Sequence, residues 1–254
     1  IPKIMMMNRL GVMKMSKIVT IWGNSGAYKT STAVKVATKL AKHGDTILLS
    51  VDNCKPSLPI LLPMDNTSCS LGKVLSEVSI TNESICRNMM TVKGLDLCVI
   101  GYRETENRKT YAEYTVEKAT EFLSVLRELA EYIVIDCTSN IANNVLTAVS
   151  LLSSDCRLYL ASADLNGIAF YGSQFPLLED RFKPEKHIKI LSLPPTNVDV
   201  DINTVAEVIG NIEYEIPYSA VVRSQMNYGA LFETASDTAY NSAIENIIGG
   251  AILV

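Results

Sequence analysis

The sequence predicts an α/β protein: one doubly wound domain in which helices cover both faces of a mostly parallel sheet of about seven strands. Short apolar runs alternate with helical patterns along almost the whole chain, which is typical of a parallel sheet with helical crossovers. The strand candidates are apolar at successive positions, as expected when both faces of a strand are covered. No linker rich in Pro, Gly or Ser divides the 254 residues, so we expect a single domain over residues 15–254.

The expected elements follow one another in the order that such a fold requires. Strands are predicted at residues 17–22, 46–51, 95–101, 132–135, 156–161, 187–193 and 214–216. Helices are predicted at residues 30–43, 71–77, 114–130 and 238–248. In the third of these helices the apolar residues fall on one face, which predicts packing against the sheet.

The start of the chain and its cysteines bear on where the protein resides. Cationic residues interrupt the apolar ones near the start, so no continuous apolar segment of a signal peptide is present. We interpret residues 1–14 as a leader or an expression remnant, with the natural start at Met13 or Met15. No stretch approaches the roughly 18 apolar residues of a membrane span. No two of the six cysteines form a Cys-x-x-Cys pair, so we expect reduced thiols, no zinc site and a cytoplasmic location.

A glycine-containing loop joins the first expected strand to the first expected helix. It consists of Gly23, Asn24, Ser25, Gly26, Ala27, Tyr28, Lys29, Thr30 and Ser31. A strand, such a loop and a helix in this order predict a phosphate-binding loop, because loop amides and the helix N-terminus can donate to phosphate oxygens. Lys29 is then expected to bind the β- and γ-phosphates, and Thr30 to place its hydroxyl on Mg²⁺.

One position departs from the usual GxxxxGK[ST] pattern of such loops. Tyr28 stands where the second glycine belongs, and a positive φ at a tyrosine would cost about 1–3 kcal/mol of strain. The alternative interpretation is an ordinary turn between a strand and a helix, followed by Lys-Thr by chance. The surrounding strand and helix, together with the later motifs, favour the phosphate loop.

Two aspartates end expected strands, Asp52 the second and Asp136 the fourth. Ligands of open α/β sheets bind at the carboxyl ends of the strands, so we expect both carboxylates to order Mg²⁺ through water. The alternative is a helix cap or a turn hydrogen bond, which aspartate often makes after a strand. Thr138 and Ser139 follow Asp136, and for them γ-phosphate sensing and an ordinary loop role remain equal alternatives.

These motifs together resemble the ParA/MinD family of deviant Walker P-loop ATPases, also called the SIMIBI class, over residues 16–250. Some partition ATPases of the family carry tyrosine at the position of Tyr28. Further segments match the family's order, namely the second-strand motif at 48–52, the Walker B strand at 132–136, the next strand at 151–160, and base-proximal segments at 216–218 and 227–229.

The resemblance implies a nucleotide site and a nucleotide-driven cycle. ATP and Mg²⁺ are the implied cofactors, with Lys29, Asp52 and Asp136 as catalytic residues and Pro217 near the base. Thr30, Asp52 and Asp136 would serve the metal. Members of the family hydrolyse ATP, sandwich it in a homodimer, and bind DNA, membrane or a protein marker as dimers.

Three departures from the family bear on that cycle. Asn24 replaces the signature lysine that reaches across the dimer, which weakens the expected clamp on the triphosphate. Cys54 replaces the second aspartate of the second-strand motif, so we expect slow or absent hydrolysis and at most a weak ATPase. Ser192 stands where the family places an asparagine that reads adenine, which leaves base specificity open.

Three functions remain open for this chain. The first is a switch that positions a protein partner or cellular machinery, as the CpaE/TadZ-like localisation ATPases of pili and secretion systems do. The second is a partition ATPase of the ParA type, and the third is a non-hydrolysing scaffold. The only cation after Lys189 is Arg223, which disfavours DNA binding and a cationic membrane-binding helix at the C-terminus. A protein partner is therefore expected.

Overall fold

An eight-stranded sheet occupies the centre of the fold in our computed structural model, which describes residues 16–57, 61, 69–107, 109–178, 180–196 and 201–254. The strand order is β3-β4-β2-β5-β1-β6-β7-β8. The strands are β1 (Lys17–Gly23), β2 (Thr46–Ser50), β3 (Met90–Thr91), β4 (Leu97–Ile100), β5 (Tyr132–Asp136), β6 (Cys156–Ser162), β7 (His187–Ser192) and β8 (Ile212–Ile216). The leader and start sites that the sequence suggests lie outside the described residues.

All neighbouring strands run parallel except β3, which pairs with β4 in the antiparallel direction. The predicted mostly parallel sheet is therefore confirmed. The prediction of about seven strands omitted β3, because a strand of two residues is too short to produce a periodic pattern. Every residue of β2, β4 and β6 is buried, as the continuous apolar runs predict.

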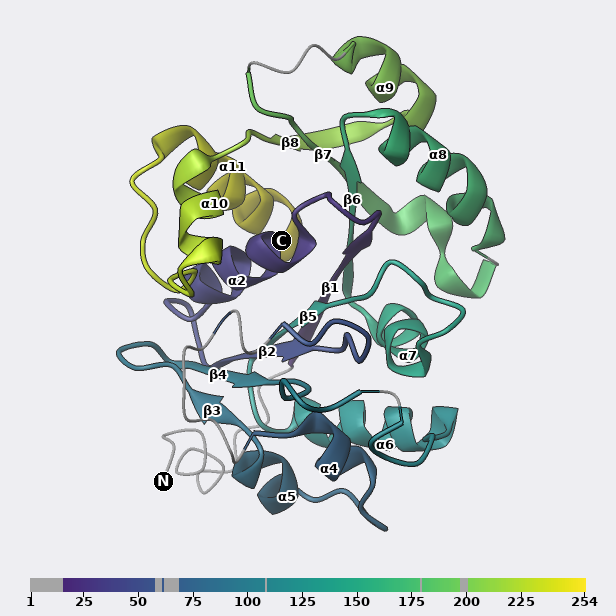
Figure 1. Cartoon of the computed structure of the whole chain (residues 1–254), viewed down its shortest axis with the longest axis vertical. Helices are drawn as coiled ribbons and strands as arrows, with labels where there is room; N and C mark the ends of the chain where they lie inside the picture. Colours follow the sequence, from purple (N-terminus) through teal and green to yellow (C-terminus); the bar gives the residue numbers. More distant parts are fainter. Residues whose placement is uncertain (1–15, 58–60, 62–68, 108, 179, 197–200) are drawn as a thin grey trace.

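Helices cover both faces of the sheet (Figure 1). One face carries α2 (Lys29–Leu40), α10 (Ala220–Asn227) and α11 (Thr238–Ile247). The other carries α4 (Leu71–Leu75), α5 (Asn82–Arg87), α6 (Val116–Arg127), α7 (Val145–Ser153), α8 (Leu165–Gln174) and α9 (Ile202–Ile209). None of the helices in the described ranges has the length and apolar character that a membrane crossing needs.

The register of the parallel strands brings the ends of β1, β5 and β6 to one edge of the sheet. Ile21 pairs with Asp136 on one side of β1, and Gly23 pairs with Leu160 on the other. Residues that are far apart in the sequence therefore meet where these strands end. The loop after β1 opens at this carboxyl edge.

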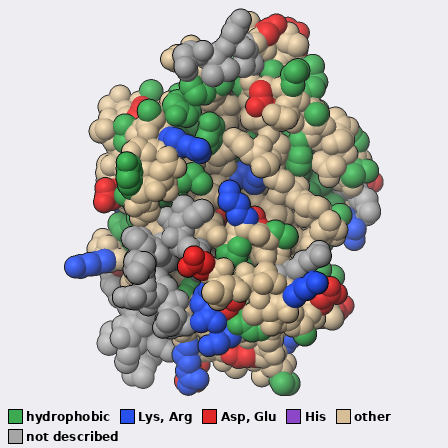
Figure 2. Space-filling view, in the orientation of Figure 1, with side chains coloured by type: hydrophobic (Ala, Val, Ile, Leu, Met, Phe, Trp, Pro, Cys, Tyr) green, Lys and Arg blue, Asp and Glu red, His purple; other side chains and the backbone are tan. Residues whose placement is uncertain are grey.

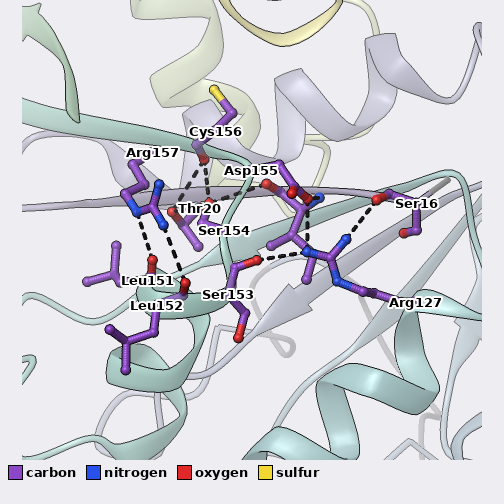
Figure 3. Close-up of polar contacts among 11 residues, drawn as sticks. Ser16, Thr20, Arg127, Leu151, Leu152, Ser153, Ser154, Asp155, Cys156 and Arg157 are labelled. Atoms are coloured by element: carbon purple, nitrogen blue, oxygen red, sulfur yellow. Dashed lines mark hydrogen bonds and ion pairs between the residues drawn. The ribbon is translucent and has the colours of Figure 1, made fainter. Parts of the chain in front are cut away.

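At the opposite, amino edge of the sheet, Arg127 of α6 and Arg157 of β6 bind the C-terminal end of α7 (Figure 3). Arg127 donates to the carbonyl of Ser153 at 2.8 Å and pairs with the Asp155 carboxylate at 2.9 Å. Arg157 donates through Nε to the carbonyl of Leu151 at 2.8 Å. The last carbonyls of a helix lack intrahelical partners and carry partial negative charge, so both guanidinium groups stabilise the end of α7.

Arg127→Ala should lower the free energy of unfolding by about 1–3 kcal/mol, because it removes charge-assisted hydrogen bonds at a partly buried helix end. Urea unfolding measures the change. Arg87→Ala is the matched control, since Arg87 pairs with Glu83 on the exposed surface of α5 and should change stability by less than about 0.5 kcal/mol. Equal losses in the two variants would contradict this role of Arg127.

Candidate functional site

The loop between β1 and α2 has the backbone that a phosphate cradle requires. Gly23 has a φ of 141°, and a Cβ there would lie 1.8 Å from the carbonyl oxygen of Leu160. Gly26 has a φ of 91°, with open space where a Cβ would point. Tyr28 has a φ of 58° and a ψ of 29°, so the left-handed tyrosine considered from the sequence is present and carries its strain.

The N-terminus of α2 differs from the other described α-helices in having no side-chain cap. Tyr28 occupies the cap position, but its side chain accepts no hydrogen bond from the first turn, which contains no acidic residue. Each of the others is capped, by Ser70, Thr81, Thr115, Asn144, Asp164, Asp201, Ser219 or Asp237. The first amides of α2 therefore point toward the loop without a side-chain acceptor, as in an anion-binding helix terminus.

Lys29, the first residue of α2, folds back over the loop. Its Nζ donates to the carbonyl of Asn24 at 2.9 Å and to the Ser139 hydroxyl at 2.8 Å. Burial lowers the pKa of Lys29, an effect that the nearby Asp136 carboxylate opposes. The ammonium group is therefore held at the opening of the loop. Ser139, for which the sequence left γ-phosphate sensing as one alternative, lies beside it.

Thr30 and Asp136 form a direct pair beside this lysine. The Thr30 hydroxyl donates to Asp136 Oδ2 at 2.8 Å. Burial raises the pKa of Asp136 to about 6, although the bond from Thr30 and the charge of Lys29 lower it. One hydroxyl and one carboxylate are the protein oxygens with which Mg²⁺ is commonly bound beside phosphates, so the donor set fits that ion.

Asp52 lies in the turn after β2, where Oδ1 accepts from the backbone amides of Cys54 and Lys55, both at 2.9 Å. The turn role that the sequence left as an alternative is therefore present. Asp52 is close enough to raise the pKa of Asp136. A second carboxylate thus faces the site, while Cys54 is exposed beside it.

An open cleft of about 690 Å³ adjoins the loop on the side of Asp52. Polar side chains from several segments line it, among them Ser25, Asn53, Cys54, Ser139 and Asn143. Its wall includes Tyr111, which donates to the buried carboxylate of Glu106 at 2.8 Å. The cleft gives the site a wide opening toward solvent at the carboxyl edge of the sheet.

On the other side of the loop, Pro217 lies close to the start of α2. A small pocket of about 20 Å³ is lined by Pro217 together with Tyr28, Ser31 and Tyr218. The rings of Tyr28 and Tyr218 are 6.1 Å apart between centroids. The structure therefore brings the predicted base-proximal segment 216–218 to the phosphate loop, and within that segment Tyr218 as well as Pro217 lines the pocket.

Ser192 and Asn24, the two positions that depart from the family pattern at the loop and at β7, join the phosphate loop to the ends of neighbouring strands. Ser192 is buried and donates to the carbonyl of Ala27 at 3.0 Å, so its hydroxyl is engaged with the loop backbone. Asn24 is 2% exposed and bonds to Ser162 at the end of β6. Ser162 was not among the predicted site residues, although it directly follows the strand predicted at 156–161, at the edge where ligands bind.

Asp136→Asn should stabilise the ligand-free protein at pH 7.5. Because the folded pKa is raised to about 6 from 3.8, the folded state binds the proton more tightly, and the free energy of unfolding falls as pH rises from about 4 to 6. Asparagine keeps an acceptor for Thr30 without the buried charge, so the gain should be about 1–3 kcal/mol at pH 7.5.

The gain should shrink toward zero as the pH falls through this window, which urea unfolding at pH 7.5, 6.0 and 4.5 measures. Asp180→Asn is the control, because Asp180 is exposed and should show no such gain. A loss of stability in Asp136→Asn that is equal at all three pH values would contradict the assignment.

Comparison with curated sequences finds one relative, which matches this chain over part of its length. No protein-family model matches the chain. An uncharacterised ATP-binding protein of Methanocaldococcus jannaschii is 24% identical over 148 residues, which are 58% of this chain and 53% of that protein. The match thus spans about half the length of this relative.

Solved structures share the fold over nearly the whole chain. The ParA family ATPase from Chlorobium tepidum superposes with a TM-score of 0.74 at 15% identity, covering 92% of this chain and 98% of that one. The cell division ATPase MinD from Pyrococcus furiosus gives 0.71 at 16% identity, covering 93% and 100%. The resemblance that the sequence motifs indicated is therefore confirmed at the level of the fold: this chain is built as the ParA/MinD-type P-loop ATPases are.

Proposed function

We propose that this protein is a nucleotide-dependent switch that binds Mg·ATP in the loop between β1 and α2. The observation that carries the proposal is the uncapped N-terminus of α2, with Lys29 held over a loop in which Gly23 and Gly26 have positive φ and open space lies beside Gly26. Amides and an ammonium group that converge in this way bind phosphate. The partial match to an ATP-binding protein and the shared ParA/MinD fold support ATP as the nucleotide.

Each site residue has a role that follows from its contacts. Lys29 would exchange its bonds to Asn24 and Ser139 for oxygens of the β- and γ-phosphates. Thr30 would ligate Mg²⁺, while Asp136 and Asp52 would hold waters of the ion. Bound Mg²⁺ would neutralise charge on the phosphates. The backbone from Gly23 to Tyr28 would cradle the phosphates, Ser31 would continue it at the helix start, and Pro217 would lie against the base.

Hydrolysis is proposed to be slow. A carboxylate that orients the attacking water is worth far more than a thiol, because it is charged and accepts hydrogen bonds strongly. Cys54 is exposed at the cleft, and its thiol donates to Asn53 at 3.6 Å. The position therefore faces the region where water would enter, without the group that would activate it.

The output of the switch is proposed to be a nucleotide-dependent homodimer that positions a protein partner in the cytoplasm, as in pilus or secretion-type localisation. Net charge is −4, and the face in Figure 2 carries scattered Lys and Arg side chains without a continuous basic surface over α10 and α11. This favours a protein over DNA as the partner. DNA partition of the ParA type is the second candidate, carried by the fold shared with a ParA family ATPase.

Lys29→Ala should weaken Mg·ATP binding by about 100-fold, because it removes charge-assisted hydrogen bonds to two phosphates. Titration calorimetry measures the affinity. Light scattering with Mg·ATP and with Mg·ADP measures the mass, which should double only for the wild-type protein with ATP. Lys42→Ala is the control, since Lys42 is exposed just after α2 and should leave both results unchanged.

The two measurements separate the nucleotide-dependent switch from the non-hydrolysing scaffold. ATP binding with a mass that is indifferent to nucleotide would overturn the switch and leave the non-hydrolysing scaffold. Equal affinity in the wild-type protein and Lys29→Ala would remove the nucleotide site itself.

Cys54→Asp should raise ATP turnover at least about tenfold, because a carboxylate would be restored where water is to be oriented. Phosphate release measures turnover, and the same substitution in the Lys29→Ala background corrects for contaminating activity. Cys54→Ser is the matched control, with a small polar side chain and no charge. Turnover that is unchanged in Cys54→Asp would show that the thiol does not limit hydrolysis.

A further inference from the structure

The side chain of Asn24 is fully engaged within its own subunit. Its Oδ1 accepts the backbone amide of Ser162 at 2.9 Å, and its Nδ2 donates to the Ser162 hydroxyl at 2.8 Å and to the carbonyl of Ser25 at 2.9 Å. A backbone amide can only donate and a carbonyl can only accept, so the orientation of the Asn24 amide is fixed by its partners. The side chain is 2% exposed and presents nothing to a second subunit.

From Ser162 the hydrogen bonds continue into α8. The Ser162 hydroxyl donates to Asp164 Oδ1 at 2.6 Å, and the same oxygen caps α8 by accepting the amide of Gly167 at 2.9 Å. Gly167 is the buried residue of α8, and a Cβ there would lie 2.0 Å from the Ser162 carbonyl oxygen. These hydrogen bonds and this close approach therefore fix the start of α8 against the end of β6.

At the other end, the same asparagine is joined to the phosphate loop. Its carbonyl accepts Lys29 Nζ at 2.9 Å, and its backbone belongs to the loop itself. A continuous series of hydrogen bonds thus runs from Lys29 through Asn24, Ser162 and Asp164 to the amide of Gly167. Its members lie at residues 24–29 and 162–167, so the series connects segments about half the chain apart.

We infer that Asn24 is a positioning residue that couples the phosphate loop to the N-terminus of α8 within one subunit. The inference rests on the proposed function, because it assigns to the loop's nucleotide a second effect at α8. Phosphate would replace the Asn24 carbonyl as the partner of Lys29, but its bonds to the loop amides would fix the loop backbone. The remaining bonds of the series, from the Asn24 side chain to Gly167, would then open less often. A lysine at position 24 has no acceptor for the amide of Ser162, so this coupling depends on asparagine.

Hydrogen exchange at the amide of Gly167 tests the coupling without nucleotide. Asn24→Ala and Ser162→Ala should each speed this exchange about tenfold, because a hydrogen bond that held the start of α8 is lost. Ser154→Ala is the matched control: Ser154 is buried at the other end of β6, where its hydroxyl donates to the carbonyl of Cys156 at 2.6 Å. The amides of β5 serve as a reference for global unfolding.

Acceleration at Gly167 in Asn24→Ala and Ser162→Ala, with unchanged exchange in β5 and in Ser154→Ala, supports the inference. No acceleration in a folded Asn24→Ala variant or in Ser162→Ala, or an equal acceleration in Ser154→Ala, overturns it. Because Ser162→Ala keeps the bond from the Ser162 amide to Asn24, it tests the series even where Asn24→Ala fails to fold.

A second measurement, with saturating Mg·ATP, separates this inference from the proposed function. Binding should slow exchange at Gly167 at least about threefold in the wild-type protein and in Ser154→Ala, but not in Asn24→Ala. Binding by calorimetry without any effect at Gly167 in the wild-type protein overturns the coupling and leaves the nucleotide site intact. Absence of binding overturns the proposed function, and the ligand-free measurement then still decides whether Asn24 braces α8.

Discussion

The burial of a lysine and an aspartate at the carboxyl edge of the sheet is the constraint around which the loop is built. Burial shifts both groups toward their neutral forms, lowering the pKa of Lys29 and raising that of Asp136 to about 6. Such groups are tolerated only where hydrogen bonds compensate for lost water. Ser139 and the carbonyl of Asn24 serve Lys29, and Thr30 serves Asp136. In the ligand-free site both groups therefore have hydrogen-bond partners, while burial still disfavours their charged forms.

The helix ends at the two edges of the sheet differ in whether side chains bind their free backbone groups. At the amino edge, Arg127 and Arg157 supply donors to the last carbonyls of α7. At the carboxyl edge, the first turn of α2 has no side-chain acceptor, and a strained Tyr28 stands in the cap position. A cap at that position would have stabilised the helix by about 1 kcal/mol. Every other described α-helix has a side-chain cap at its N-terminus. The stability given up at this one terminus is consistent with a binding function for it.

The order of motifs along the chain was sufficient to predict the mostly parallel sheet and to group most of the residues that the structure brings together at the candidate site. In a parallel sheet every strand's carboxyl end faces the same edge, so Lys29, Asp52 and Asp136 could be grouped from the positions where their strands end. A left-handed backbone at Tyr28 was raised by the loop motif only as a condition, and the structure has it. Two-residue β3 could not be predicted, because its pairing with β4 is tertiary and leaves no periodic signal.

The partners of Asn24 and Ser192 were equally hidden from the sequence. Both were judged as replacements for residues that would touch the nucleotide, yet Asn24 bonds to Ser162 and Ser192 to the carbonyl of Ala27. Which strand end lies beneath the loop depends on strand order, and sequence order alone does not give it. A substitution at a motif position can therefore replace an expected contact with the ligand by a hydrogen bond within the protein.

This relocation changes the charge balance that a nucleotide meets. With Asn24 neutral and turned inward, Lys29 faces the carboxylates of Asp136 and Asp52. Above pH 6 the Asp136 carboxylate is ionised, and one ammonium group among two carboxylates supplies no net positive charge for a polyanion. Under the proposed function, the divalent cation would therefore have a larger share of the attraction here than in a site with a second lysine. Nucleotide affinity in this chain should accordingly depend on Mg²⁺ as strongly as on the loop itself.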